Sequence, residues 1–514
     1  MFPKTRFYRF LEMIPGTLIW GTLATAIALA FFRPIWALYF VIVFDLYWLF
    51  RVIYFIFNLY ISWRQYQTDT RINWFERLKG EQPEWTKIRH LIFLPTYKEG
   101  IEVLRTTLSA LSRVDYPKDK FIIVLAGEER DKENFLRCAA DAAAEFKGIF
   151  GEFLITLHPR GLPDEIPGKG SNLHWAGWKA KAAVDRLGIP YENIMASLFD
   201  VDTVTHPQYF AYLTYKYLTV KDPQRASYQP IPLYNNNMWV SPALIRVAAW
   251  GTTFWLMTEL PRRERLFTFS SHSMPFKALT DVGFWEKDIV TEDTRIFLQA
   301  YLHYDGNYRV EPLFIPVSMD TVMTNRYAES LKALYVQQRR WAWGIEHFPY
   351  LFTHFLRKKK MSIWKKNKII WYVLEGMYSW ATAPLLIFIL GQLPFWVGAE
   401  QVGSTVLFQS TPVILQWIMT AAMAGIVVSA LLMTRLLPPI PSGTPRLRRL
   451  HMLWQWLLLP FSLIIFGAIP AIDAQTRLML GKYLGFNVTK KTRVGVGARG
   501  TFSSGEIQPT PLLR

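Results

Sequence analysis

Long apolar runs at both ends of the chain constrain its fold more than any other feature. Two runs open the sequence, over 15–32 and 35–63, and three follow a central region, over 369–396, 412–433 and 452–472. A helix needs about 20 apolar residues to cross a hydrocarbon core of about 30 Å, so these runs predict membrane spans. The charged fraction of 19% is below the roughly 25% of soluble proteins, which indicates lipid-facing surface.

Basic residues orient the first pair of runs. Lys4, Arg6 and Arg9 precede the pair, and Arg64 and Arg71 follow it. Because cytoplasmic flanks carry an excess of Lys and Arg, both ends are expected inside. A basic start followed by small residues is also typical of a cleaved signal peptide. The second run follows after only a short turn, however, and this favours an N-terminal transmembrane hairpin over 1–63.

The side of the membrane on which the chain ends is open at this level. The loop 397–411 has no Lys or Arg and is expected outside, whereas 434–451 carries arginines and is expected inside. If 452–472 then crosses fully, the basic tail lies outside and violates the charge rule. Pro460 and Pro470 interrupt this run, so either the run is re-entrant or a span is split elsewhere.

The net charge of +18 raises the question of a nucleic-acid partner. A dense basic group directly precedes the third apolar run, and no zinc-finger or other nucleic-acid motif accompanies it. This placement is typical of a cytoplasmic flank on anionic lipid, so we expect membrane lipids as partners and no nucleic acid. We interpret 346–368 as a basic interfacial segment, 369–480 as a C-terminal transmembrane region and 481–514 as a basic tail, disordered at its end. The basic group consists of Arg357, Lys358, Lys359, Lys360, Lys365, Lys366 and Lys368.

Strings of strand and helix character alternate between the apolar runs, within 64–345. Such alternation predicts a mostly parallel sheet with helices on its faces, in an α/β domain inserted between the N- and C-terminal transmembrane helices. Ligands of these sheets bind beyond the carboxyl ends of the strands, so functional residues are expected there. The expected strands are 88–95, 121–125, 153–157 and 194–199, and the expected helices are 102–113, 133–146 and 173–186.

Asp200 and Asp202 flank Val201 directly after the expected strand 194–199. Two carboxylates one residue apart on an extended segment point to the same side. They can hold a hard cation through oxygen ligands and leave its other positions for a diphosphate, whose charge the cation would offset. The pattern D-x-D occurs in many loops by chance, and only its place after a buried strand favours a metal site.

Glu292 and Asp293 follow Thr291 after a short apolar string. A carboxylate at this place could accept the proton of an attacking hydroxyl, as general-base catalysis requires. Taken alone, the same residues are more often a helix N-cap than a catalytic pair.

Gln337, Arg340 and Trp341 lie in the string QQRRW, in an expected amphipathic helix just before the membrane. Arginine presents a fork of donors to phosphate oxygens, and tryptophan offers a flat apolar face to a sugar ring. An interfacial helix with snorkelling arginines and an aromatic-belt tryptophan would carry the same residues.

Two shorter motifs lie at other turns of the same region. Thr96 and Glu99 belong to PTYKE, which closes the first strand, where a nucleotide base or ribose would lie. Lys169 belongs to GKGSN, a flexible turn that opens a helix and leaves the lysine available to a phosphate. The spacing of a Walker A loop is absent.

Taken in order, PTYKE, GKGSN, FDVDT, TED and QQRRW resemble the family 2 glycosyltransferases. The resemblance is to the membrane-integrated group that includes cellulose synthases, hyaluronan synthases and ceramide glucosyltransferases, and it covers about 88–344 and the flanking spans. It implies a GT-A fold, a nucleoside-diphosphate sugar donor that is expected to be a UDP-sugar, Mg²⁺ or Mn²⁺, and inversion at the anomeric carbon.

The resemblance also implies roles for individual residues. Asp202 matches the direct metal ligand and Asp200 its companion near the ribose and diphosphate. Asp293, with Glu292 beside it, matches the catalytic base. The residues implied in donor binding are Thr96, Glu99, Glu128, Lys169, Asp200, Gln337 and Arg340, and Trp341 is implied in acceptor binding.

Glu128 marks a departure from the family pattern. The second strand of the family ends in aspartates that bind the nucleotide base, whereas this strand ends in Ala126-Gly127-Glu128-Glu129. Glutamate keeps the charge and adds a methylene, so the identity of the nucleotide is less firmly implied.

The sequence leaves the acceptor open. A growing polysaccharide would use the spans as its path, and Asp45 and Glu375 could line that path or be held by Arg51 for structural reasons. A lipid that receives a single sugar would need no path. A non-catalytic scaffold or transporter is a third interpretation, which the intact carboxylates of the site disfavour. We expect an enzyme of polysaccharide synthesis in the inner cell membrane, with a cytoplasmic catalytic domain.

Overall fold

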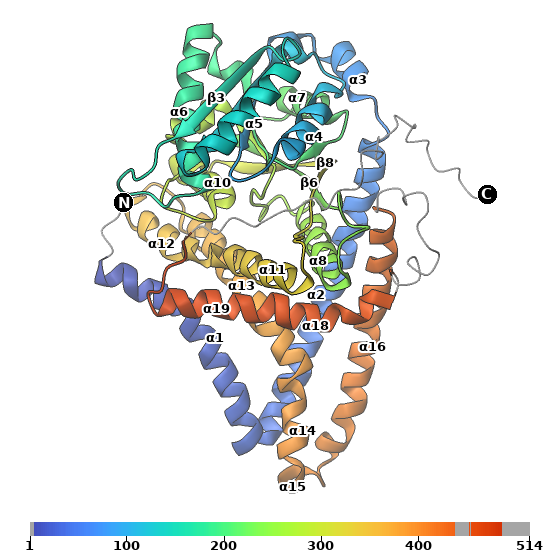
Figure 1. The fold of residues 1–514 in the computed structure, drawn as a ribbon. Coiled ribbons are helices and arrows are strands. Elements are labelled where there is room, and N and C mark those ends of the chain that lie inside the picture. The colour runs from blue at the N-terminus through green and yellow to red at the C-terminus, as the bar shows by residue number, and fades with distance from the viewer. Residues whose placement is uncertain (1–4, 437–451, 453, 486–514) are drawn as a thin grey trace, which may run out of the picture.

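The computed structural model describes residues 5–436, 452 and 454–485. Figure 1 shows an α/β domain at one end of the molecule and long apolar helices that extend away from it. Most of the expected inside loop 434–451, and the predicted disordered end of the tail, lie outside the described residues.

The domain is built on an eight-stranded mixed sheet in the order β3-β2-β1-β4-β7-β6-β8-β5. Strands β3, β2, β1 and β4 are parallel, β7 is antiparallel to both of its neighbours, and β6 and β8 are again parallel to each other. Six strands therefore run in one direction and their carboxyl ends share one edge. The strands are β1 Arg89–Pro95, β2 Phe121–Glu128, β3 Glu152–His158, β4 Ile194–Leu198, β5 Val204–Thr205, β6 Ala226–Tyr234, β7 Ser273–Pro275 and β8 Arg309–Met319.

Helices cover both faces of the sheet because the strand side chains alternate between two cores. In β1, Leu91 and Phe93 enter the core under α6, α9 and α10, whereas Ile92 and Leu94 enter the core under α4, α5 and α7. All four side chains are fully buried, which is why the strand has an unbroken apolar sequence. The helices of the domain are α3 Trp74–Glu81, α4 Ile101–Ser112, α5 Lys132–Glu145, α6 Lys169–Leu187, α7 Tyr209–Thr219, α8 Ala243–Glu259, α9 Phe276–Asp281, α10 Glu292–His303, α11 Tyr327–Ala342 and α12 His347–Arg357.

The helices outside the domain are apolar and expose large side chains. Four helices among the described residues are long and apolar enough to cross a membrane, over 6–32, 34–69, 406–432 and 455–479, and α13 with α14, bent by 41°, would make a fifth. Phe50 and Phe57 of α2 are more than 60% exposed, as expected of a lipid-facing surface. The elements are α1 Arg6–Phe32, α2 Pro34–Asp69, α13 Ile363–Phe388, α14 Leu393–Val397, α15 Ala399–Val402 and α16 Val406–Thr434.

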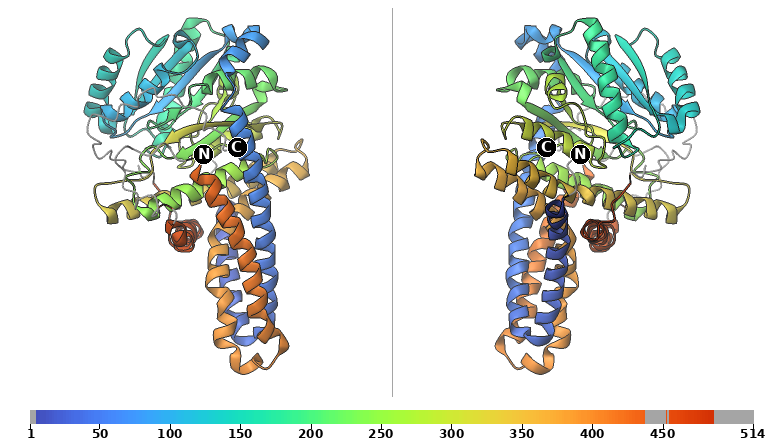
Figure 2. Two further views of the ribbon diagram at one scale, coloured as in Figure 1. Left: turned by 90° about the vertical axis from the view of Figure 1, so that its right-hand side faces the viewer. Right: turned by 90° about the vertical axis from the view of Figure 1, so that its left-hand side faces the viewer.

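The last apolar run differs from the others in direction. Figures 1 and 2 show α18 Leu459–Leu463 and α19 Ile469–Met479 lying across the bundle of α1, α2, α13 and α16, between it and the domain. Pro460 and Pro470 occupy the first turns of these two helices, where proline is tolerated. The prolines thus begin helical segments, and the run stays helical without turning back.

Candidate functional site

Polar side chains gather at the carboxyl ends of β1 and β2. The Thr96 backbone N–H donates to the Ala126 carbonyl at 2.8 Å, and the Asn172 side chain of α6 donates to the same carbonyl at 2.7 Å. The Glu99 carboxylate accepts the Tyr97 backbone N–H at 2.6 Å. Thr96 is buried, so PTYKE is a folded turn that is fastened to the neighbouring strand.

Glu128, the departure from the family pattern, is paired within its own loop. It is buried, and it accepts the Nε–H of Arg130 at 2.9 Å. The Arg130 guanidinium lies over the Tyr97 ring, 4.5 Å from its centroid. An added Cβ on Gly127 would lie 2.2 Å from the Phe135 ring, so only glycine allows α5 to pack this closely. Glu128, Arg130 and Tyr97 therefore form one cluster beside β1.

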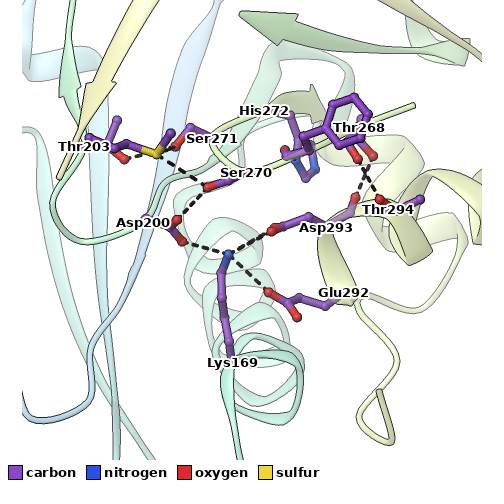
Figure 3. Close-up of polar contacts among 12 residues, drawn as sticks. Lys169, Asp200, Thr203, Thr268, Ser270, Ser271, His272, Glu292, Asp293 and Thr294 are labelled. Atoms are coloured by element: carbon purple, nitrogen blue, oxygen red, sulfur yellow. Dashed lines mark hydrogen bonds and ion pairs between the residues drawn. The ribbon is translucent and has the colours of Figure 1, made fainter. Parts of the chain in front are cut away.

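Lys169 is the centre of the site, at the first position of α6. Its Nζ lies 2.9 Å from Asp200 Oδ1, 3.1 Å from Glu292 Oε1 and 3.0 Å from Asp293 Oδ1, and Figure 3 shows the three carboxylates pointing toward it. Burial alone would lower the pKa of Lys169, but the surrounding carboxylates raise it well above its ordinary value. The lysine is therefore a fixed positive charge. An added Cβ on Gly170 would lie 3.0 Å from the Glu286 carbonyl, so the glycine lets α6 approach the loop before α10.

Asp200 and Asp202 have different surroundings. β4 ends at Leu198, and the Thr203 N–H donates to the Asp200 carbonyl at 2.9 Å, so the pair lies in a turn and not on the extended segment that the sequence predicted. A turn here rotates successive side chains away from strict alternation. Asp200 accepts the Ser270 hydroxyl at 2.6 Å in addition to Lys169. Asp202 is buried and accepts the backbone N–H of Asp320 at 2.8 Å.

Glu292 and Asp293 occupy the first turn of α10, with Thr291 at the N-cap. The interpretation of TED as a helix N-terminus is therefore confirmed. Both carboxylates also contact Lys169, and the role as a base stays a prediction. Burial raises the pKa of Glu292, and the nearby Lys169 ammonium opposes this. The Asp293 carbonyl accepts the Thr268 hydroxyl at 2.6 Å, which holds the turn against the sheet.

The QQRRW string lies in the last turns of α11. Gln337 and Gln338 are buried, and the Trp341 ring lies 6.0 Å from the Tyr234 ring between centroids. The charge of Arg340 acts on Glu292 and Tyr234, so this arginine faces the site. A cavity lies beside it between α8, α11 and the end of β8. It is lined by Tyr234, Ile245, Ala249, Thr252, Asp320, Thr321, Val322, Leu334, Gln337, Gln338 and Trp341.

Three residues of the site were not predicted from the sequence. Tyr234 ends β6 and Asp320 follows β8, at the same sheet edge as Asp200, and Ser270 lies before β7. Burial and the charges of the aspartates raise the pKa of Tyr234 above its ordinary value. The polar strings that follow apolar strands, YNNN and SMDT, were a signal for the first two. Ser270 has no comparable signal.

The carboxylates fit a metal ion that is shared with a substrate. Within the described ranges, no group of three His, Cys, Asp or Glu side chains could hold a metal ion by itself. Asp200 and Asp202 together supply carboxylate oxygens of the kind that Mg²⁺ prefers, and Mg²⁺ is commonly bound by one or two carboxylates plus substrate phosphates. These two carboxylates therefore suit Mg²⁺ or Mn²⁺ only if a diphosphate supplies further ligands to the ion.

The fold and this site define an α/β domain with a cluster of carboxylates beyond its strands, joined to apolar helices. The model of the family described as glycosyl transferase family group 2 matches residues 197–399. The matched range contains Asp200, Asp202, Asp293, Arg340 and Trp341, and it begins after Thr96, Glu128 and Lys169. The predicted fold class is confirmed as a GT-A-like α/β domain flanked at both ends by apolar helices that are long enough to cross a membrane. The narrower resemblance to cellulose and hyaluronan synthases stays a prediction.

Solved structures that resemble the chain include several glycosyltransferases. A mannosyltransferase from Pyrobaculum calidifontis, in complex with GDP-mannose and Mn²⁺, is 14% identical, with 72% of this chain and 99% of that chain covered and a TM-score of 0.39. S. aureus TarS in complex with UDP-GlcNAc is 14% identical, with 67% and 90% covered and a TM-score of 0.36. Glucosyl-3-phosphoglycerate synthase from Mycobacterium tuberculosis, with Mg²⁺ and UDP, is 13% identical, with 55% and 84% covered and a TM-score of 0.31. Similarity at this level assigns no donor or acceptor to this chain. A search of curated proteins finds no match.

Proposed function

We propose that the chain is a membrane-embedded, inverting family 2 glycosyltransferase that transfers a sugar from a nucleoside-diphosphate sugar to a hydroxyl acceptor at the cytoplasmic face of the inner membrane. The observation that carries the proposal is the convergence of Asp200 and Asp293 on one buried ammonium, that of Lys169. These residues come from the end of a central strand and from the start of α10. Their meeting supports a single site at which a diphosphate and an acceptor hydroxyl are bound side by side.

The roles follow from charge and position. Asp293 takes the proton of the acceptor hydroxyl, whose oxygen bonds to the anomeric carbon on the face opposite the nucleotide. The bond from that carbon to the diphosphate oxygen breaks, and its electron pair leaves with the diphosphate. Lys169 and Arg340 supply the positive charge that stabilises the leaving group. Asp202 and Asp200 would hold Mg²⁺ or Mn²⁺, which supplies further charge neutralisation when bound.

Other residues bind and orient the two substrates. We assign Thr96, Glu99 and Glu128 to the nucleoside end of the donor, because they lie at or just beyond the carboxyl ends of β1 and β2. Gln337 contributes to the diphosphate end, and Trp341 supports the acceptor through its ring. Glu292, buried against Lys169, balances the lysine charge next to the base.

The acceptor that we propose first is a growing polysaccharide. Glu375 gives no support for a path through the spans, because it is paired with Arg51 and lies 3.6 Å from Arg265. The alternative is a lipid acceptor that receives a single sugar. The apolar part of the cavity beside Trp341, formed by Ile245, Ala249 and Leu334, favours an acceptor with an apolar portion.

The donor and the product can be tested together in membranes that contain the protein. Radiolabelled UDP-glucose, UDP-GlcNAc and GDP-mannose are supplied in turn with Mg²⁺ or Mn²⁺, and the products are separated by size. A ladder of oligomers supports polysaccharide synthesis, and one labelled lipid band supports the alternative. If the purified protein neither binds nor hydrolyses any of the three donors in the presence of Mn²⁺, the scaffold interpretation takes the place of both.

A further inference from the structure

A chain of hydrogen bonds joins the first turn of α10, which carries Asp293, to the segment that follows Trp341. At its centre is Glu346, the last residue of the short helix η6 Trp343–Glu346. Its Oε1 accepts the Thr291 hydroxyl at 3.0 Å, and its Oε2 accepts the Trp343 indole N–H at 2.9 Å. One carboxylate thus holds the residue before Glu292 and a residue two positions after Trp341.

Thr291 is in the right position to cap α10 but is used differently. Threonine at an N-cap ordinarily accepts a backbone N–H of the first helical turn. The Thr291 side chain makes no such bond, although its backbone occupies the N-cap position of α10. The hydroxyl is directed to Glu346 instead, so a local stabilisation of the helix is exchanged for a contact with another element.

His347 and Arg295 add a second contact between the same two segments. The Arg295 Nε–H lies 3.2 Å from His347 Nδ1, and His347 Nε2 lies 3.4 Å from the Thr291 hydroxyl oxygen. Burial and the Arg295 charge lower the pKa of His347 well below its ordinary value. A neutral imidazole that accepts at Nδ1 carries its proton on Nε2. Every donor therefore faces an acceptor, from Arg295 through His347 and Thr291 to Glu346.

We propose that Glu346 is a positioning residue that sets the distance between the base Asp293 on α10 and the acceptor-binding Trp341 on α11. The inference rests on the proposed function, because it assigns those roles to the two residues. Glu346 touches neither substrate and acts through Thr291 and Trp343. Small displacements of reacting groups cost about 100-fold in rate per ångström, so a shift of α10 against α11 lowers transfer while the donor site stays intact.

Glu346→Gln tests this assignment with little change of shape. The amide has only one acceptor oxygen. Either the Trp343 N–H loses its acceptor, or the NH₂ group donates to the Thr291 oxygen and the Thr291 proton loses its acceptor, so the order of donors and acceptors is broken in both cases. We expect the rate of sugar transfer from the nucleotide sugar that the wild type uses to fall by about tenfold or more. The affinity for UDP in the presence of Mn²⁺ should stay within about twofold of the wild-type value. Thr291→Val should act in the same way, and Thr291→Ser, which keeps the hydroxyl, should retain activity. The matched control is Glu329→Gln, an exposed carboxylate in the first turn of α11.

Two further readouts separate positioning from general damage. Glu346→Gln and Thr291→Val act on the same contact, the hydrogen bond between Thr291 and Glu346. The double variant should therefore lose no more activity than the more severe single variant. Hydrogen exchange over α10 should be faster in Glu346→Gln and Thr291→Val but unchanged in Glu329→Gln, whether or not a donor is known. Wild-type transfer by Glu346→Gln, a matching loss of UDP binding, or multiplicative losses in the double variant would overturn the inference. Absence of transfer by the wild type itself would contradict the proposed function, and the exchange result would still decide the role of Glu346.

Discussion

At Lys169 one ammonium lies within 3.1 Å of three carboxylates. An uncompensated charge in a buried place is costly, so the lysine and the carboxylates stabilise one another. The carboxylates outnumber the lysine, however, and their excess charge attracts a divalent cation and makes its binding favourable. Lys169 and the metal are therefore expected to share the neutralisation of the site.

Lys169→Met should make the site depend more strongly on metal. The change leaves the carboxylates of Asp200, Glu292 and Asp293 without their common partner, so we expect a lower melting temperature in EDTA. Mn²⁺ should then raise the melting temperature by more than it does in the wild type, because it binds the folded state more tightly. Transfer should fall by about 100-fold. Differential scanning fluorimetry of the detergent-solubilised protein measures both shifts. Lys181→Met, which breaks an exposed pair with Asp185, is the control, and equal Mn²⁺ shifts in wild type and Lys169→Met would contradict the account.

The residue scale also shows what a sequence can and cannot indicate. Asp200, Asp293 and Lys169 were predicted as site residues because each lies in a short motif at the end of an expected strand or the start of a helix, and the structure brings their side chains together. Ser270 was missed because its role depends on a contact with Asp200, 70 positions away in the chain. Such long-range pairing leaves no local pattern.

At the scale of elements, α11 and α19 are joined by one carboxylate. Asp473 of α19 accepts from Arg339 at 2.9 Å and from the Tyr335 hydroxyl at 3.1 Å, both on α11, and from Arg477 of its own helix at 2.6 Å. Because α11 carries Arg340, the helix that lies across the apolar bundle is fastened directly to a functional element.

Asp473→Asn should disturb α11 without disturbing donor binding. The amide keeps one acceptor but loses the charge that holds Arg339, so we expect transfer to fall by about threefold to tenfold, consistent with a partly buried ion pair. Arg477→Gln removes only the contact within α19 and should have less effect. Steady-state transfer and UDP binding are measured for both variants. Equal activity of the two variants would contradict a role for the link between the helices.

The direction of α19 predicts the side on which the chain continues. Because 455–479 lies across the bundle (Figure 1), its end should be on the same side as the α/β domain. Cys138 is buried, so introduced cysteines can be labelled separately. Lys482→Cys should react with a membrane-impermeant maleimide in inverted vesicles, and Gln401→Cys, in α15 at the far end of the bundle, in intact cells. Labelling of both cysteines from the same side would show that 455–479 crosses the membrane.

The elements themselves were largely predictable. The four expected parallel strands and three expected helices correspond to β1, β2, β3, β4, α4, α5 and α6, because each buried strand is an apolar string between turn residues. Strands β5–β8 were not predicted. β5 and β7 have two and three residues, and prolines interrupt β6 and β8. The direction of 455–479 could not be predicted, because hydropathy depends on composition and does not report how a helix lies relative to its neighbours.

At the scale of the whole molecule, the site lies on the side of the domain that faces the apolar helices. α2 continues past its apolar part to Asp69, whose carboxylate accepts the Tyr212 hydroxyl of the domain. Arg265, in the loop after α8, pairs with Glu259 at 3.1 Å and lies 3.6 Å from Glu375 of α13. These contacts hold the domain on the bundle, an arrangement that the proposed transfer to an acceptor in or at the membrane requires.

The central claim is that Asp293 acts as the base for glycosyl transfer at this site. The most direct measurement compares the wild type with Asp293→Asn in liposomes, following transfer of radiolabelled sugar from the active donor together with UDP binding in the presence of Mn²⁺. The account predicts that the wild type transfers sugar, and that Asp293→Asn binds UDP about as tightly but transfers roughly 1,000-fold more slowly, in line with the loss of a general base. Transfer by Asp293→Asn at a rate close to that of the wild type, or loss of UDP binding together with transfer, would contradict it.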